Sequence, residues 1–218
     1  DIRRRRAPVG AAPRPSHALA LVHPAPDATA VDLQLLGPPV ARLVAGGRPQ
    51  PLALQAKRFA LLAHLAVADA PVRRDALLLL LWPELTDANA RGALRKALHY
   101  LRQAIGSEAI VTGVDDTVTV DRTRVVTDVA ALDAALAAGR PGDALARWRG
   151  ALLDGFHLDD APEFERWLDG ERARLEARVV RAVLRELDAL EAAGDVAAAA
   201  PLALRLLDRR PLDEPVLQ

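Results

Sequence analysis

A cationic face on residues 87–105 is the part of the sequence best suited to bind an anionic partner. Successive helical residues lie about 100° apart, which gathers the apolar residues of this stretch on about one third of the circumference. These residues are Ala90, Leu94, Ala97, Leu98, Leu101 and Ile105. The opposite side carries Arg91, Arg95, Lys96, His99, Arg102 and Gln103. The pattern predicts one amphipathic helix with a core face and a cationic face.

The cationic face holds four Arg or Lys side chains and no acid, so its charges repel one another unless an anion balances them. The DNA major groove accepts an α-helix, and Arg or Lys there can donate hydrogen bonds to guanine or to phosphates. An ordinary solvated surface is the alternative interpretation. The place of the helix in the chain favours DNA, because it follows two shorter predicted helices and precedes a predicted hairpin, as in a winged helix-turn-helix.

A second group of residues could do chemistry: His157 with Asp159, Asp160 and Glu163 has the composition of a metal or acid–base site. The group contains a single His, and a zinc site normally needs more than one strong ligand. Asp and Glu residues in a predicted loop more commonly cap helices or form turns. The sequence therefore predicts no enzyme, no metal site and no cofactor.

Residues 31–127 have the pattern of a winged helix-turn-helix. Short alternating apolar segments separated by Gly and Pro indicate strands, and longer apolar periods indicate helices. The second helix is expected to end at Trp82-Pro83 because proline cannot continue a helix, and the third at Gly106. In order, the predicted elements are strands at about 31–36, 40–44 and 50–54, helices at about 56–68, 74–81 and 87–105, and a hairpin of 110–112 with 117–120.

Residues 128–218 are predicted to form helices only. Gly142-Asp143 and Gly194-Asp195 each open a helix after a short break, as in stacked helical hairpins of the tetratricopeptide kind. A long helix between them has one apolar stripe, expected to lie in a core, with an interaction groove as the alternative: Phe164, Trp167, Leu168, Leu175, Val179, Val183, Leu187 and Leu190. The predicted fold class is mainly α with small β-sheets, a winged helix-turn-helix followed by an all-α tetratricopeptide-like helical domain.

The charge is distributed unevenly along the chain although the formal net charge is zero. Residues 1–30 hold five Arg against two Asp, whereas residues 128–218 hold twelve basic against eighteen acidic residues. Residues 1–30 lack a sustained apolar period and are predicted to be a disordered basic leader.

The absence of Cys is compatible with a cytoplasmic setting, and no apolar run approaches the roughly 20 residues of a membrane span. Because the chain stops within what looks like a new helix after Pro211, we expect it to be truncated.

Three segments in order resemble the OmpR-type winged helix, in the version found in SARP-type activators, a family of bacterial antibiotic-pathway regulators. They are residues 55–65, 72–84 and 90–106, which include a Trp-Pro turn and repeated Leu-Arg pairs. The resemblance implies that the third helix reads the major groove through Arg91, Arg95, Lys96, His99 and Arg102, and that Lys57 and Arg58 contact phosphates. The wing tip Val114-Asp115-Asp116 departs from the family, because it is acidic where a cation would meet the minor groove.

Residues 128–218 resemble the bacterial transcriptional activation domain that follows the winged helix in this family, and we expect this domain to be truncated. The resemblance implies promoter DNA with direct repeats, RNA polymerase and a second copy of the chain as partners, and an activator function, with no membrane. The alternative function is a protein-interaction scaffold whose winged helix has lost DNA binding, and the acidic wing tip is the observation behind it.

Overall fold

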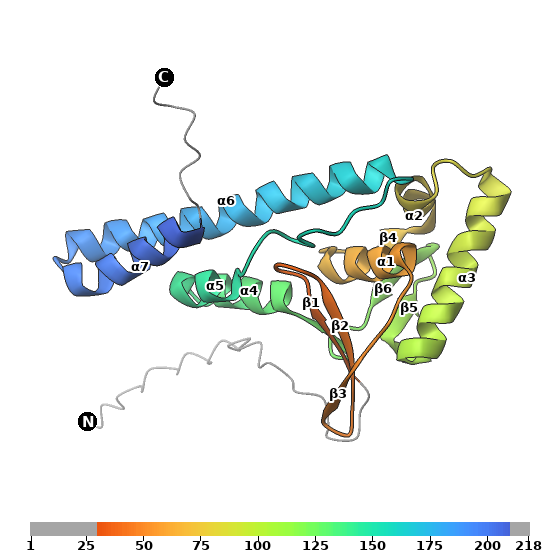
Figure 1. The fold of residues 1–218 in the computed structure, drawn as a ribbon, viewed down its shortest axis with the longest axis horizontal. Helices are drawn as coiled ribbons and strands as arrows, with labels where there is room; N and C mark the ends of the chain where they lie inside the picture. The colour runs from red at the N-terminus through yellow and green to blue at the C-terminus, as the bar shows by residue number, and fades with distance from the viewer. Residues whose placement is uncertain (1–29, 210–218) are drawn as a thin grey trace, which may run out of the picture.

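The structure, a computed structural model, describes residues 30–209 and is mainly helical with two small sheets (Figure 1). The predicted final helix after Pro211 lies outside the described residues, as does the predicted leader except for Ala30, which begins the first strand. The predicted fold class is confirmed: two sheets and three helices come first, and the rest of the described chain is helical. No helix between residues 30 and 209 is long and apolar enough to cross a membrane.

The first sheet has four strands in the order β3-β2-β1-β7. β1 pairs antiparallel with β2, with Leu33 opposite Ala41, and it pairs parallel with β7, with Leu33 opposite Thr127. The sequence patterns did not predict β7, which is only three residues long and joins the sheet from about ninety positions further along the chain. The strands are β1 (Ala30–Gln34), β2 (Val40–Ala45), β3 (Arg48–Pro51) and β7 (Val125–Thr127).

The second sheet forms the wing and packs against three helices. Its order is β4-β6-β5, so the predicted hairpin gains a third strand, the short β4, which directly precedes the second helix. The elements are α1 (Ala56–Val67), β4 (Val72–Arg73), α2 (Arg74–Leu81), α3 (Asp87–Ile105), a 3₁₀ turn (Ser107–Ala109), β5 (Ile110–Thr112) and β6 (Thr117–Val120). α1 was predicted to bury one face, but every residue from Phe59 to Val67 is buried, because neighbouring elements cover it on all sides.

Four helices make up the remainder: α4 (Asp128–Ala137), α5 (Pro141–Arg147), α6 (Pro162–Ala192) and α7 (Val196–Arg209). They pack as the hairpins α4 with α5 and α6 with α7. α6 is 31 residues long and runs from α2 to α7 (Figure 1). The predicted stripe is its core face, with Phe164, Leu168, Leu175, Val179 and Val183 buried and the other three members partly buried.

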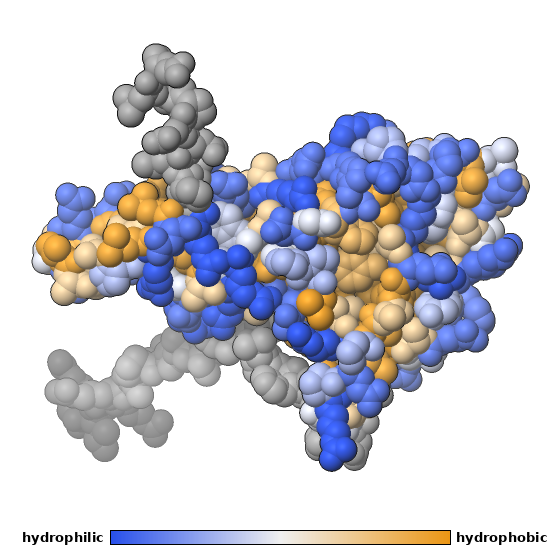
Figure 2. Space-filling model, in the orientation of Figure 1, coloured by the Kyte–Doolittle hydropathy of each residue, from blue (hydrophilic) through white to orange (hydrophobic). Residues whose placement is uncertain are grey.

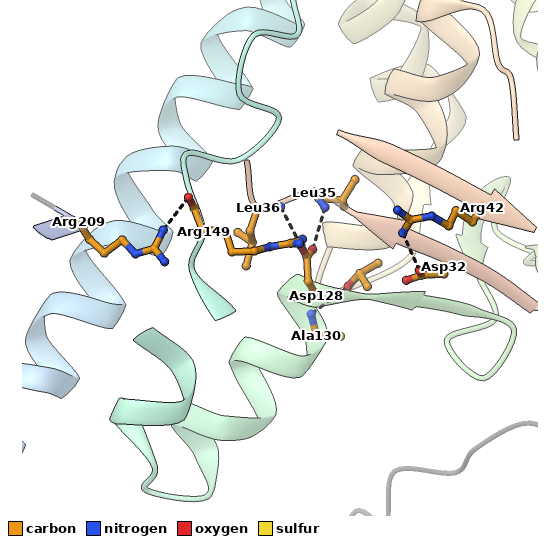
Figure 3. A network of polar contacts seen from close by, with 9 residues as sticks. Asp32, Leu35, Leu36, Arg42, Asp128, Ala130, Arg149 and Arg209 are labelled. Carbon is orange, nitrogen blue, oxygen red and sulfur yellow. Dashed lines mark hydrogen bonds and ion pairs between the residues drawn. The ribbon is translucent and has the colours of Figure 1, made fainter. Parts of the chain in front are cut away.

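Asp128, at the start of α4, connects the first sheet to the helical region (Figure 3). Its carboxylate accepts the backbone N–H groups of Leu35 at 2.8 Å and Leu36 at 3.1 Å, just beyond the end of β1. Arg149 donates to the same carboxylate at 3.0 Å, and Arg209, at the end of α7, donates to the carbonyl of Arg149 at 2.8 Å. One mostly buried carboxylate thus accepts hydrogen bonds from two backbone N–H groups beyond the end of β1. Leaving these N–H groups unpaired would destabilise the fold.

A chain of rings joins α1 to the first turns of α6. Phe59 lies 5.3 Å from Phe156, which lies 6.0 Å from Phe164, and Phe164 lies 5.2 Å from Trp167. The imidazole of His64 meets Trp167 edge to face at 4.5 Å. Burial lowers the pKa of His64 from 6.5 to about 4, so this ring is neutral at pH 7. The winged helix and the helical region therefore share one apolar core.

Candidate nucleic-acid interface

α3 has the two faces that the sequence predicts. Its buried residues are those predicted for the core: Ala90, Leu94, Ala97, Leu98, Leu101 and Ile105. The helix starts after Thr86 and ends at Gly106, whose φ of 97° is a conformation that other residues adopt only at a cost. Its outer face is turned away from the first sheet and from α6, at one end of the molecule (Figure 1).

Three of the predicted DNA-binding residues, Arg95, Lys96 and His99, lie exposed on this outer face. None of them forms an ion pair or a side-chain hydrogen bond within residues 30–209. On a helix, positions 95 and 99 are one turn apart, and position 96 lies beside them. Their polar groups are therefore free to meet an anion.

Arg91 is exposed one turn earlier on the same face, where its Nε donates to Asp87 at 2.9 Å. This hydrogen bond raises the pKa of the Arg91 guanidinium, which is charged in any case. Because the pair is exposed, it is weak, and a phosphate could replace Asp87 at little cost. Arg91 thus differs from Arg95 in having a competing partner.

Arg102 holds the wing to α3. Its Nη2 donates to Thr112 Oγ1 at 2.7 Å, and its Nε and Nη2 both lie 3.3 Å from the carbonyl oxygen of Ile110. Both acceptors belong to β5, so the guanidinium fixes the strand relative to the helix. In this structure Arg102 contacts the wing and positions it.

The two cations predicted on α1 differ in their surroundings. Lys57 Nζ lies 3.0 Å from Glu84 and 2.9 Å from Asp160, and its side chain is only 19% exposed. It thereby connects α1, the turn before α3 and the loop before α6. The guanidinium of Arg58 stacks on Tyr100 of α3, 3.8 Å from the ring centre, a cation–π contact that orients Arg58 beside the outer face.

Arg74 is a cation that the sequence reasoning missed. It opens α2, and with Arg91, Arg95 and Asp116 it lines a hollow of about 180 Å³ between α2, α3 and the wing tip. Its Nε lies 3.2 Å from the carboxylate of Asp116, but this Nε makes no hydrogen bond within the described residues. The neighbouring Arg73 pairs with Asp75 through a hydrogen bond that raises the pKa of Arg73 and lowers that of Asp75. Arg74 directly follows β4, so its position beside the wing tip can be inferred only when β4 is known to pair with the wing.

The wing tip is exposed and acidic. Val114 is fully exposed, and Asp115 is exposed beside it without an ion pair among the described residues. Asp116 has a φ of 56°, which Asp and Asn tolerate better than most residues. Its side chain turns toward Arg74, so this carboxylate neutralises a cation of the candidate interface.

The group around His157 does not come together as a metal site. His157 contacts Asp159 at 3.0 Å and Glu165 at 2.8 Å, and the hydrogen bond that its Nδ1 donates to the Glu165 carboxylate raises the pKa of the imidazole. Asp160 pairs with Lys57 and Glu163 with Arg166. Within residues 30–209 no set of three or more His, Cys, Asp or Glu side chains is arranged to hold a metal ion.

Comparisons with known proteins agree with this architecture. Residues 116–218 match the family model of the bacterial transcriptional activator domain. The solved structure of Mycobacterium tuberculosis EmbR in complex with a low affinity phosphopeptide has a TM-score of 0.55 and 25% sequence identity. The match covers 86% of this chain and 52% of EmbR, so the chain spans about half the length of that protein. No curated protein matches the sequence.

The fold and the comparisons together support a bacterial transcriptional regulator, with a winged helix joined to a bacterial transcriptional activator domain. More particularly, they support a regulator of the SARP type, the family that the sequence resembles. The match to the activator domain begins at position 116, in the wing, ahead of the boundary at 128 that the sequence suggests.

Proposed function

We propose that this regulator binds promoter DNA in a sequence-specific manner and activates transcription. In this proposal residues 31–127 are the DNA-binding domain and residues 128–218 are the helical domain that contacts other proteins. The observation that carries the proposal is the outer face of α3, where Arg95, Lys96 and His99 are exposed and lack acidic partners among the described residues. A helix of this kind fits the major groove, where Arg and Lys read guanine.

Other cations would fix the protein on the DNA backbone. Two arginines lie next to the exposed residues on the outer face of α3 and are suited to bind phosphates. Arg58 is stacked on Tyr100, and Arg91 is held only by an exposed ion pair. Arg102 contributes by holding the wing and by its own charge. Lys57 would have to exchange its pairs with Glu84 and Asp160 for a phosphate, so we expect it to contribute least of the seven residues.

The family resemblance supports RNA polymerase, direct-repeat DNA and a second copy of the chain as partners of the regulator. In this scheme the helical domain provides the protein contacts, because α6 and α7 present exposed apolar side chains while α3 lies at the other end of the molecule (Figure 1). DNA and protein partners could then bind at the same time.

Selection of genomic DNA fragments by the 218-residue chain, at two salt concentrations, tests the DNA-binding proposal. We expect a repeated motif to be enriched and affinity to fall steeply as salt rises, because several phosphate contacts release counterions. Replacing Arg95 and Lys96 by Ala should cost about 1–3 kcal/mol for each lost base contact and should relax the selected motif. The matched control replaces Arg140 and Arg166 by Ala, two exposed arginines of the helical region, and changes the net charge equally.

The acidic wing tip favours a second function, a protein-interaction scaffold without DNA binding. Asp115 and Asp116 would face the phosphates if the wing approached DNA, and like charges oppose binding. Under this alternative no motif is enriched, binding is negligible even at low salt, and the Arg95 and Lys96 variant equals its control. That set of results would replace the DNA-binding proposal.

A further inference from the structure

A groove on the helical region, away from α3, is bordered by three arginines. It is a hollow of about 510 Å³ between the end of α4 and one side of α6. The residues around it are Leu136 from α4 and Arg178, Arg181, Ala182, Leu184, Arg185 and Asp188 from α6. Three guanidinium groups therefore surround the hollow against one carboxylate.

Two of these guanidinium groups lack a carboxylate partner in the described chain. Arg178 is paired with Asp133 at 2.6 Å. Arg181 donates only to a carbonyl of its own helix, that of Ala177 at 3.2 Å, and Arg185 has no hydrogen bond or ion pair within residues 30–209. The described arginines nearer the start of α6 all form ion pairs, namely Arg166, Arg172 and Arg174.

Their positions make the unpaired charges unfavourable in isolation. Arg181 and Arg185 are four positions apart, so their side chains are neighbours on one helix face, about 5–6 Å apart at Cβ, and like charges at this spacing repel. They lie in a region that is acidic as a whole, since residues 128–218 carry twelve basic against eighteen acidic residues. A local excess of positive charge in an acidic region calls for an anion at this place.

The groove also exposes apolar surface. Leu184 is 47% exposed beside the two arginines, and Leu136 is half-buried across the hollow. Apolar surface gathers over the same end of the molecule, where α6 and α7 pack, and the large exposed side chains there are Leu184, Val196, Leu204 and Leu207 (Figure 2). An occupant that combines carboxylates with an aliphatic side chain would match both properties of the groove.

The geometry points to an acidic peptide segment of a partner protein as the occupant of this groove. The segment is helical, with two carboxylates one turn apart that pair with Arg181 and Arg185, and with an aliphatic residue that packs on Leu184. Carboxylates at i and i+4 of a helix have the same sequence spacing as Arg181 and Arg185, and Arg binds carboxylates with paired hydrogen bonds. This inference rests on the proposed role of the helical domain in contacting proteins and identifies the chemistry of the contact.

Fluorescence anisotropy of a labelled helical peptide tests the groove without any DNA. The peptide carries two Glu residues four positions apart with a Leu between them, and a matched peptide has Gln in place of both Glu. We expect the 218-residue chain to bind the Glu peptide and Arg181→Ala with Arg185→Ala to weaken binding by at least about tenfold, because two charge-assisted contacts are lost. The Arg140→Ala with Arg166→Ala variant, of equal net charge, should stay within about twofold of the parent, since these arginines lie outside the groove.

Thermal melting checks that both variants are folded. Three results would each overturn the inference: no binding of the Glu peptide up to about 1 mM, the weakest contact worth calling specific; equal losses in the two variants; or equal binding of the Gln peptide. A dimer of the chain that dissociates on replacing Arg181 and Arg185 would also overturn it, because the occupant would then be a second copy. Since no DNA is present, failure here leaves the DNA-binding proposal standing, and failure of DNA selection leaves this result unaffected.

Discussion

Asp116 at the wing tip lies against a cation of the candidate DNA interface, and replacing it by Asn should strengthen DNA binding. The carboxylate is 3.2 Å from Arg74 Nε, and the side chains of Asp116 and Arg74 are 64% and 29% exposed. A pair this exposed contributes about 1 kcal/mol or less, so Asp116→Asn should unfold at nearly the same denaturant concentration as the parent. Asn also tolerates the positive φ of this position, so the tip keeps its shape.

Releasing Arg74 adds one cation that can contact phosphate. Each such contact steepens the slope of log affinity against log salt by about 0.9. Between 50 and 200 mM salt the variant should therefore lose about three to four times more affinity than the parent, and at low salt it should bind about three- to fivefold more tightly. Fluorescence anisotropy with one duplex across a salt series measures both quantities.

Asp115→Asn is the matched control, because it removes the same charge from the adjacent exposed residue without freeing a paired cation. It should leave the salt slope unchanged. Equal salt slopes for the parent and both variants would show that Arg74 does not reach a phosphate. The inference that Asp116 keeps Arg74 from binding DNA would then be wrong.

Three further predictions concern residues that hold the interface in place. Arg102→Lys keeps the charge but loses the paired contacts to Ile110 and Thr112, so urea unfolding should show a loss of about 1 kcal/mol with an unchanged salt slope; unfolding at the same urea concentration as the parent would contradict the assigned contacts. Asp128→Ala leaves two strand-end N–H groups unpaired and should cost about 2–4 kcal/mol in urea unfolding, whereas a loss below 1 kcal/mol would contradict the assigned contacts. Because folding lowers the pKa of His64, the unfolded chain takes up a proton at a higher pH than the folded chain does. The contribution of His64 to the free energy of unfolding is therefore fully present above pH 6.5 and declines as the pH falls toward 4. Between pH 7 and pH 5 the titration of His64 should lower the free energy of unfolding by about 2 kcal/mol, and this part of the loss should be absent in His64→Phe. Identical pH profiles of stability for the parent and the variant would refute the prediction.

The parts of the fold that follow from local periodicity could be predicted from the sequence. The core face of α3 is confirmed residue by residue, because a helix of nineteen residues repeats its apolar pattern over several turns. The ends of α2 and α3 also agree, since Pro83 and Gly106 act locally. The SARP resemblance is confirmed as well, because it depended on three segments in order and on the second half of the chain.

Features that depend on residues far apart in the sequence could not be predicted. β4 and β7 have two and three residues, too short for a periodic signal, and each exists because a partner strand lies beside it. The ion pairs of Lys57 with Asp160 and of Arg74 with Asp116 also join distant segments, so neither the partial burial of Lys57 nor the role of Arg74 could be inferred. The DNA-binding assignments remain predictions, which the structure supports for Arg95, Lys96 and His99 by their exposure and lack of partners within residues 30–209.

The ring chain from Phe59 through Phe156 and Phe164 to Trp167 has a consequence for how such a regulator would act on a promoter. Because these rings pack α1 against α6 without an intervening linker, the outer face of α3 and the groove on α6 keep a fixed separation and a fixed angle. A protein bound at that groove would be displayed on one side of the duplex only. Moving the operator by half a helical turn, about 5 base pairs, would then carry that protein to the opposite side of the DNA, whereas a full turn would restore its position. Because of this aromatic packing, regulation would depend on the position of the operator along the DNA.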